Sequence, residues 1–199
     1  MEPFTYPAIP HVRRHGPQGY ADAESFRSWL RDEFAFRCVF CLVRERWENP
    51  VGRFAVDHLR PQSRYPELAT EYDNLFYVCT SCNAVKGDQE VPDPTQTLLS
   101  TTVVVEDDGT LVGTTPQAAE LLELLNLNYR TLRQRRGLLL AAIRVLHERD
   151  PELYRRWMCF PDDLPDLSRL RPPGGNSRPD GLAQSHLARR QRGELPATY

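Results

Sequence analysis

The sequence is nearly free of lysine. Lysine and arginine together number 25 in the 199 residues, and Lys86 is the one lysine among them. The formal net charge is −2, and the isoelectric point is about 6.2. Coating nucleic acid by charge alone requires a strongly cationic surface, which this composition excludes. Any contact with nucleic acid therefore has to be local, or it has to be arranged by a partner.

Long apolar runs are missing as well. No uninterrupted apolar stretch reaches the roughly 18 residues that a membrane span needs. The N-terminal stretch, MEPFTYPAIPHVRRHG, does not have the charged start and apolar core of a secretory signal. The hydrophobic content of 40% and the charged content of 26% are typical of globular proteins. We therefore expect a cytoplasmic protein that makes no contact with a membrane.

Cysteine is scarce, but its spacing is informative. Four of the five cysteines form two C-x-x-C pairs, Cys38 with Cys41 and Cys79 with Cys82. In a reducing compartment, an odd number of cysteines with four of them in two C-x-x-C pairs favours a metal site over disulfides. Four thiolates complete a tetrahedral, closed Zn²⁺ site, which contributes folding free energy and has no open position for a reaction. The fifth cysteine, Cys159, is interpreted as a small buried hydrophobe rather than a reactive thiol.

Polar residues between and after the cysteine pairs suggest chemistry that a zinc clip alone does not need. Asp57, Asn74 and Asn83 offer the carboxylate and amide oxygens that suit Mg²⁺. A neutral imidazole at His58 is able to take a proton from water. Adjacent strand residues point to opposite faces, so Asp57 and His58 share a site only where the strand ends or bends. The following Leu-Arg-Pro is consistent with such an ending.

The order of four short motifs resembles a known family. CVFC, VDHLRP, DNL and CTSCNAVKGD, within about residues 36–88, resemble the zinc-stabilised branch of the HNH endonuclease superfamily. The resemblance implies a ββα-metal fold and hydrolysis of DNA phosphodiester bonds with one divalent ion. It also implies that His58 is the general base, that Asp57 and Asn83 hold Mg²⁺ or Mn²⁺, and that Asn74 orients His58. The candidates for contacts with DNA phosphates are Lys86, Arg60, Arg37 and Arg64.

Each of these residues also has a plain structural interpretation. Asp57 and His58 could be a surface pair at a strand end, Asn74 a turn residue, and Asn83 a helix cap. Lys86 and the arginines could be solvated surface charges. For the whole chain, the alternative is a zinc-ribbon module that binds nucleic acid or protein without catalysis. The near-neutral charge favours that alternative.

The composition divides the chain into four parts. Residues 1–20 are rich in Pro, Gly and His and are expected to form an extended arm. Residues 21–92 are expected to hold the HNH core, its zinc site and a preceding helix. Residues 93–160 are expected to form a hairpin and helices, and residues 161–199, rich in Pro, Gly and Arg, a flexible tail. The predicted fold class is α+β.

Periodicity and turn signals place the individual elements. Asp22 is the predicted N-cap of a helix that buries Phe26, Trp29, Leu30 and Phe34. A Pro/Gly turn within residues 48–52 leads into a strand that ends at Asp57 and His58. The remaining predictions are a strand over 75–78, a short helix at the second cysteine pair, a linker at VPDPTQ, a hairpin at residues 108–109, and helices over 116–126, 129–148 and 151–158.

The helical region carries a second and looser resemblance. The stretch TLVGTTPQAAELLELLNLNYRTLRQRRGLLLAAI resembles the region after the HNH motif in nucleases of bacterial anti-phage systems such as Septu. In those systems an ATPase partner holds the nuclease, so the resemblance implies antiviral defence and a protein partner. The same stretch could line a DNA path, but a solvated helix face is the favoured interpretation of its arginines, which are Arg130, Arg133, Arg135, Arg136 and Arg144.

Overall fold

The computed structural model describes residues 3–47 and 53–199. It confirms the α+β class, since the described chain combines helices with two small antiparallel sheets. The helices are α1 (Arg27–Glu33), α2 (Thr80–Lys86), α3 (Pro94–Thr97), α4 (Pro116–Leu124), α5 (Arg130–Arg149), α6 (Pro151–Met158) and α7 (His186–Gln191). The strands are β1 (Phe54–His58), β2 (Leu75–Cys79), β3 (Val103–Val105) and β4 (Leu111–Gly113). Short 3₁₀ segments are η1 (Ala23–Phe26), η2 (Glu45–Trp47), η3 (Pro66–Leu68), η4 (Tyr72–Asn74), η5 (Leu167–Arg169) and η6 (Pro179–Gln184).

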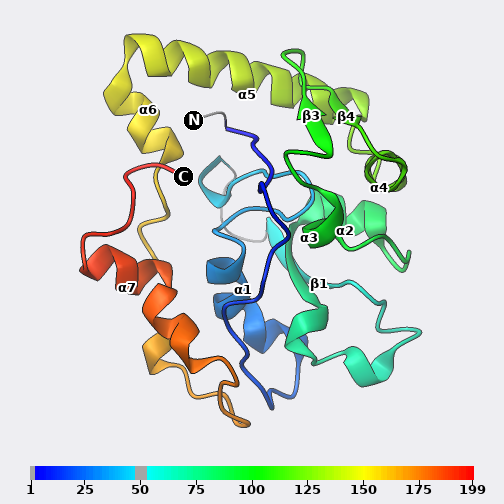
Figure 1. Ribbon diagram of the computed structural model, residues 1–199, viewed down its shortest axis with the longest axis vertical. Helices are drawn as coiled ribbons and strands as arrows, with labels where there is room; N and C mark the ends of the chain where they lie inside the picture. The colour runs from blue at the N-terminus through cyan, green and yellow to red at the C-terminus, as the bar shows by residue number, and fades with distance from the viewer. Residues whose placement is uncertain (1–2, 48–52) are drawn as a thin grey trace.

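A two-stranded ribbon followed by a helix forms the centre of the molecule (Figure 1). β1 and β2 run antiparallel, with Phe54 opposite Cys79 and Asp57 opposite Phe76. Every residue of β2 is buried, because the N-terminal helix and the zinc knuckle cover it. α2 starts at the end of β2 and packs back against both strands. The Pro/Gly turn predicted before β1 lies outside the described residues.

The predicted N-terminal helix is present in two pieces, η1 and α1. Asp22 caps it as expected, since its side chain accepts a hydrogen bond from the backbone N–H of Ser25. Phe26, Trp29 and Leu30 are fully buried against the ribbon, and α1 contacts β2. The apolar stripe on this helix therefore packs on the strand that leads to the second cysteine pair.

The accessory region matches the predicted order of hairpin and helices. β3 and β4 are joined at Gly109, whose φ of 86° favours glycine. A Cβ there would lie 2.5 Å from the backbone nitrogen of Gly137, so α5 lies directly against the turn. Arg136 is buried and donates to the carbonyl oxygens of Gly109 and Leu127. This arginine therefore holds the hairpin to α5 and is not part of a solvated face.

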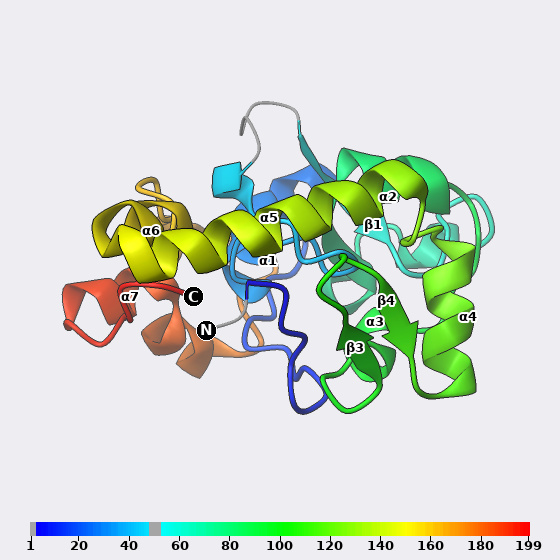
Figure 2. The same ribbon diagram turned by 90° about the horizontal axis from the view of Figure 1, so that it is seen from above.

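α5 is the longest helix and runs along one side of the molecule, from the end near α2 and α4 to α6 (Figure 2). α6 folds back from its C-terminal end and packs against it. The segment predicted as a linker before the hairpin contains the short helix α3, which begins after a side-chain cap at Asp93. In the described part of the chain, no helix combines the length and the apolar character that crossing a bilayer requires.

The C-terminal segment, expected to be flexible, is folded against the rest of the molecule in the structure. Tyr199 is buried and stacks on Phe160, with ring centroids 4.2 Å apart. The buried guanidinium of Arg44 lies 4.3 Å from the Tyr199 ring and donates to the backbone oxygen of Pro3. Widely spaced apolar side chains and polar contacts hold this segment. Such widely spaced apolar residues and polar contacts leave no helical or strand periodicity in the sequence, which is why the segment was expected to be flexible.

Candidate metal and active site

The two cysteine pairs meet in space as the spacing predicts. The Sγ atoms of Cys38, Cys41, Cys79 and Cys82 all lie within 4.8 Å of one another, and those of Cys41 and Cys79 are 3.7 Å apart. Zn–S bonds of about 2.3 Å in a tetrahedron place the sulfurs about 3.8 Å apart. The four thiols therefore fit a structural zinc ion in both number and spacing.

The local backbone explains how the four sulfurs converge. The first pair lies on a tight knuckle in which the N–H of Leu42 donates to the carbonyl oxygen of Cys38, 3.0 Å away. Leu42 closes the knuckle with a φ of 60°. The N–H of Val39 donates to the carbonyl oxygen of Tyr77, which ties the knuckle to β2. The second pair follows on the same strand, because Cys79 ends β2 and Cys82 lies in the first turn of α2.

Proton affinities in this cluster follow from burial and from the crowding of the sulfurs. Burial raises the pKa of the Cys38 thiol, and a hydrogen bond with Cys38 raises that of Cys82. Hydrogen bonds from the other three thiols lower the pKa of Cys79. Thiols lose their protons when they bind a metal, so a divalent ion is what allows the four cysteines to ionise together.

Asp57 lies near the end of β1 and is almost entirely buried. Its Oδ1 accepts from the backbone N–H of His58 at 2.8 Å and from Nζ of Lys86 at 3.2 Å. Its Oδ2 is buried and has no hydrogen-bond partner within the described residues. Burial raises the pKa of Asp57, and the charge of Lys86 opposes that shift. An unsatisfied buried carboxylate oxygen is costly, which is consistent with a site built to receive a cation.

Lys86 and Asn83 both project from α2. Only 1% of the Lys86 side chain is exposed, because the side chain folds inward to Asp57 and the carbonyl oxygen of Gly87. Asn83 is three residues earlier, so the two side chains share one face of the helix. The amide of Asn83 is half-buried and makes no side-chain hydrogen bond within residues 3–47 and 53–199. Asn83 therefore lies on the face of α2 that meets Asp57, with its donors and acceptor available.

His58 is the last residue of β1, and its ring is held from the following loop. Its Nε2 lies 2.9 Å from the carbonyl oxygen of Ala69. Because a carbonyl oxygen only accepts, we assign the ring proton to Nε2. Nδ1 of the neutral ring then carries the lone pair that can take up a proton.

Asn74 supports this arrangement through the loop, and its side chain makes its hydrogen bonds to Arg60 and Leu68 rather than to His58. Its Oδ1 accepts from the N–H of Arg60 at 2.8 Å, and its Nδ2 donates to the carbonyl oxygens of Arg60 and Leu68. The backbone oxygen of Asn74 also accepts from the N–H of Leu59. These bonds close the loop that carries Ala69, so the side chain of Asn74 positions the carbonyl that holds His58.

The three candidate arginines occupy two different places. Arg60 and Arg64, about half exposed, lie in the loop after His58, and both pair with Glu90, at 2.6 and 2.8 Å. Arg37 lies elsewhere, with its guanidinium over the ring of Tyr199. Burial lowers the pKa of Arg37. The structure thus places two of the three arginines beside the candidate active site.

The HNH endonuclease family model matches residues 38–89. The chain therefore carries an HNH domain. The matched segment includes both cysteine pairs and every residue of the ribbon and helix that forms the candidate site. This domain supports a nuclease function, which is a hydrolase activity. A search of curated proteins found no match to the chain.

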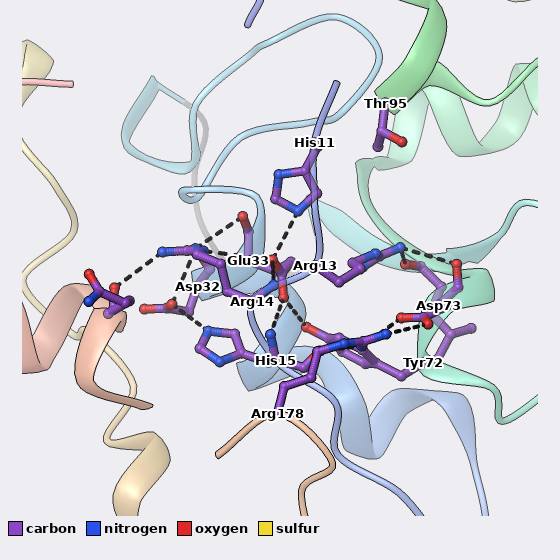
Figure 3. Close-up of polar contacts among 12 residues, drawn as sticks. His11, Arg13, Arg14, His15, Asp32, Glu33, Tyr72, Asp73, Thr95 and Arg178 are labelled. Atoms are coloured by element: carbon purple, nitrogen blue, oxygen red, sulfur yellow. Dashed lines mark hydrogen bonds and ion pairs between the residues drawn. The ribbon is translucent and has the colours of Figure 1, made fainter. Parts of the chain in front are cut away.

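A buried ionic network that the sequence analysis did not predict lies at the end of α1 (Figure 3). Asp32 is fully buried and binds Nε2 of His15 at 2.9 Å and Nδ1 of His186 at 3.0 Å. The backbone N–H of His186 donates to the same carboxylate at 2.7 Å. Burial would raise the pKa of Asp32, but the hydrogen bonds from the two histidines lower it well below its usual range.

Glu33, the next residue, binds the N-terminal arm. Its carboxylate accepts from Nε2 of His11, the backbone N–H groups of Arg14 and His15, and the hydroxyl of Tyr72, all within 3.0 Å. These contacts outweigh the effect of burial and lower the pKa of Glu33 to about 2. The clustered HVRRH of the arm and the Asp-Glu at the helix end were the available signals, but their pairing depends on the tertiary fold.

Proposed function

We propose that this protein is a metal-dependent endonuclease that hydrolyses phosphodiester bonds in DNA. The observation that carries the proposal is the orphaned, buried Oδ2 of Asp57 beside His58, inside the segment matched by the HNH model. A non-catalytic zinc ribbon has no use for a buried carboxylate oxygen without a partner. The fixed imidazole next to it is equally unexplained by a binding role.

His58 acts as the general base in this proposal. Donation from Nε2 to the carbonyl oxygen of Ala69 fixes the ring, and it leaves Nδ1 to accept a proton from the attacking water. Asn74 acts as a positioning residue, because it holds the loop that contains Ala69. A base fixed by its other nitrogen loses little orientational freedom on the way to the transition state.

Asp57 and Asn83 are the proposed ligands of the divalent ion. The free Oδ2 of Asp57 and the amide oxygen of Asn83 are hard oxygen donors, which suit Mg²⁺ or Mn²⁺. The ion, when bound, would supply positive charge that stabilises the phosphate in the transition state. The zinc clip fixes the start of α2 and so holds Asn83 in place relative to β1.

Arg60 and Arg64 are the proposed contacts for the DNA backbone. Both lie in the loop after the proposed base, and both are exposed enough to exchange Glu90 for a phosphate. Lys86 binds Asp57 and Arg37 packs over Tyr199, so neither side chain is placed for that role without rearrangement.

A protein partner is the proposed source of most of the DNA affinity. The net charge of −2 provides little counterion release, so the chain alone should bind DNA weakly. This agrees with the loose resemblance of residues 110–143 to nucleases of anti-phage systems in which an ATPase holds the nuclease. Affinity purification should recover such a partner. Robust DNA cleavage by the isolated protein at physiological salt would remove the reason to invoke one.

A plasmid assay tests the endonuclease itself. With Mg²⁺ or Mn²⁺ present, we expect nicking by the zinc-loaded protein, and we expect His58→Ala to lower the rate by about 10² to 10⁴. His147→Ala, an exposed histidine on α5, is the matched control and should cut normally. If plasmid stays intact, or if His58→Ala cuts as fast as the parent, the zinc-ribbon binding module becomes the better interpretation.

A further inference from the structure

The ion pair between Lys86 and Asp57 sets the charge of the proposed metal site. Nζ and Oδ1 are 3.2 Å apart, and the side chains are only 1% and 8% exposed. The other two side chains at the site, the imidazole of His58 and the amide of Asn83, carry no negative charge. The one carboxylate and the one ammonium therefore cancel, and these four side chains offer no net negative charge to a divalent cation.

Lys86 is not placed to swing away. It lies in the last turn of α2, its ammonium also donates to the carbonyl oxygen of Gly87, and its stem is enclosed. A cation bound at Oδ2 of Asp57 would sit on the same carboxylate as this ammonium. In a site with little water the repulsion between two such cations is only weakly screened.

The same contact decides which carboxylate oxygen is available. Oδ1 of Asp57 is occupied by Lys86 and by the backbone N–H of His58, whereas Oδ2 has no partner within the described chain. The carboxylate is thus oriented with one oxygen toward the protein and one left for a ligand. Lys86 contributes both to the charge of the site and to its orientation.

We propose, on the basis of the endonuclease function above, that Lys86 is a positioning residue that makes ion binding depend on the substrate. A phosphodiester bound at the site supplies the negative charge that Lys86 has cancelled, so the divalent ion binds tightly only together with nucleic acid. Because linkage is reciprocal, the ion strengthens DNA binding by the same factor. The free protein then holds its structural zinc but little of the second metal.

Mn²⁺ binding followed by electron paramagnetic resonance tests this directly. Zinc-loaded His58→Ala protein is used so that DNA is not cut, with and without a short duplex. Asp57→Asn in the same background measures the Mn²⁺ that binds to the DNA or elsewhere. In the His58→Ala protein that keeps Asp57 and Lys86, we expect the duplex to raise Mn²⁺ affinity by about tenfold or more. The reason is that a phosphate and a divalent ion attract strongly in a partly buried site.

Substitutions at Lys86 separate charge from packing. Lys86→Met should bind Mn²⁺ about tenfold more tightly without DNA, and the enhancement by DNA should shrink. Lys86→Arg keeps the charge and should retain weak binding without DNA and the enhancement with it. Unchanged Mn²⁺ affinity in folded Lys86→Met, with an unchanged enhancement, would overturn the proposal.

Two further results keep this test decisive. Zinc content and circular dichroism establish that Lys86→Met is folded. If it is not folded, the His58→Ala protein with native Lys86 provides the test. Equal Mn²⁺ affinity with and without the duplex in that protein refutes the dependence of ion binding on the substrate. If plasmid cleavage still depends on His58 when that result is obtained, the proposed endonuclease function stands and only the role of Lys86 is refuted. Absence of that cleavage would count against the proposed function itself.

Discussion

His58 and Ala69 are joined by a hydrogen bond of 2.9 Å from the imidazole Nε2 to a backbone carbonyl oxygen. The ring at the end of β1 is therefore oriented by a main-chain atom eleven residues later, in a loop that Asn74 closes. Side-chain substitution at residue 69 leaves this contact in place, because the acceptor is backbone. The orientation of the proposed base is consequently sensitive to the residues that hold the loop.

Asn74→Ala should lower cleavage by about 10- to 100-fold, since the loop loses three side-chain hydrogen bonds and the imidazole loses its fixed partner. Unfolding free energy should fall by about 2 kcal/mol because backbone groups are left unpaired. Asn128→Ala is the matched control, since its amide makes a similar pair of bonds to the backbone of Leu111. That variant should lose stability but keep the cleavage rate per folded molecule.

Removal of zinc should unfold the HNH domain. Cys82→Ser leaves three sulfurs, and we expect it to bind zinc weakly and to lose much of the β1, β2 and α2 structure, as measured by metal content and circular dichroism. Cys159→Ser, which alters the cysteine outside the cluster, should retain about one zinc ion per chain. Equal zinc content in the two variants would count against a four-sulfur site.

Glu33→Gln should make the free energy of unfolding less dependent on pH in the acidic range. The pKa of Glu33 is lowered from 4.5 to about 2 in the folded protein, so its carboxylate contributes stability above pH 4.5 and loses that contribution as the pH falls toward 2. The shift corresponds to about 3 kcal/mol of unfolding free energy at neutral pH. Urea unfolding of parent and variant at pH 7 and pH 3 measures this difference.

The gap between parent and Glu33→Gln should be largest at neutral pH and should narrow at pH 3. Glu123→Gln, an exposed glutamate on α4, should show a small effect at both values. A gap that stays constant with pH would mean that the carboxylate charge does not carry the contribution of Glu33.

Arg60→Ala should weaken DNA binding at low salt and reduce the slope of log affinity against log salt by about 1, as expected for the loss of one phosphate contact. Glu90→Gln should act in the opposite direction, because it releases Arg60 and Arg64 from their ion pairs. Fluorescence anisotropy of a labelled duplex at several salt concentrations measures both. Arg155→Ala on α6 is the control, and a salt slope identical in all variants would exclude this loop from the interface.

The elements of the HNH core could be predicted from the sequence because each one depends on residues that are close together in the chain. The cysteine spacing, the cap at Asp22 and the short apolar runs of β1 and β2 each depend on a few neighbouring residues, and each is found as predicted. The helices and the hairpin of the accessory region follow the same rule.

The features that the sequence did not predict depend on tertiary contacts. Lys86, at the polar end of a short helix, has the sequence context of an exposed side chain, and only the packing of α2 on β1 turns it toward Asp57. Asn74 and His58 are linked through Ala69, a residue with no polar side chain to mark it. The binding of the arm and the C-terminal segment to Asp32 and Glu33 joins parts of the chain that are far apart in sequence.

The antiparallel pairing of Phe54 with Cys79 and of Asp57 with Phe76 has a mechanical consequence. Side chains alternate along a strand, so a slip of one residue in this short ribbon would turn Asp57 outward and bring Val56 to its place. Cys79 belongs to the four-cysteine cluster at one end of the ribbon, and a zinc ion bound there would hold it in place. Zinc binding would thereby fix the pairing of β1 with β2, and with it the face of β1 that carries the Asp57 carboxylate.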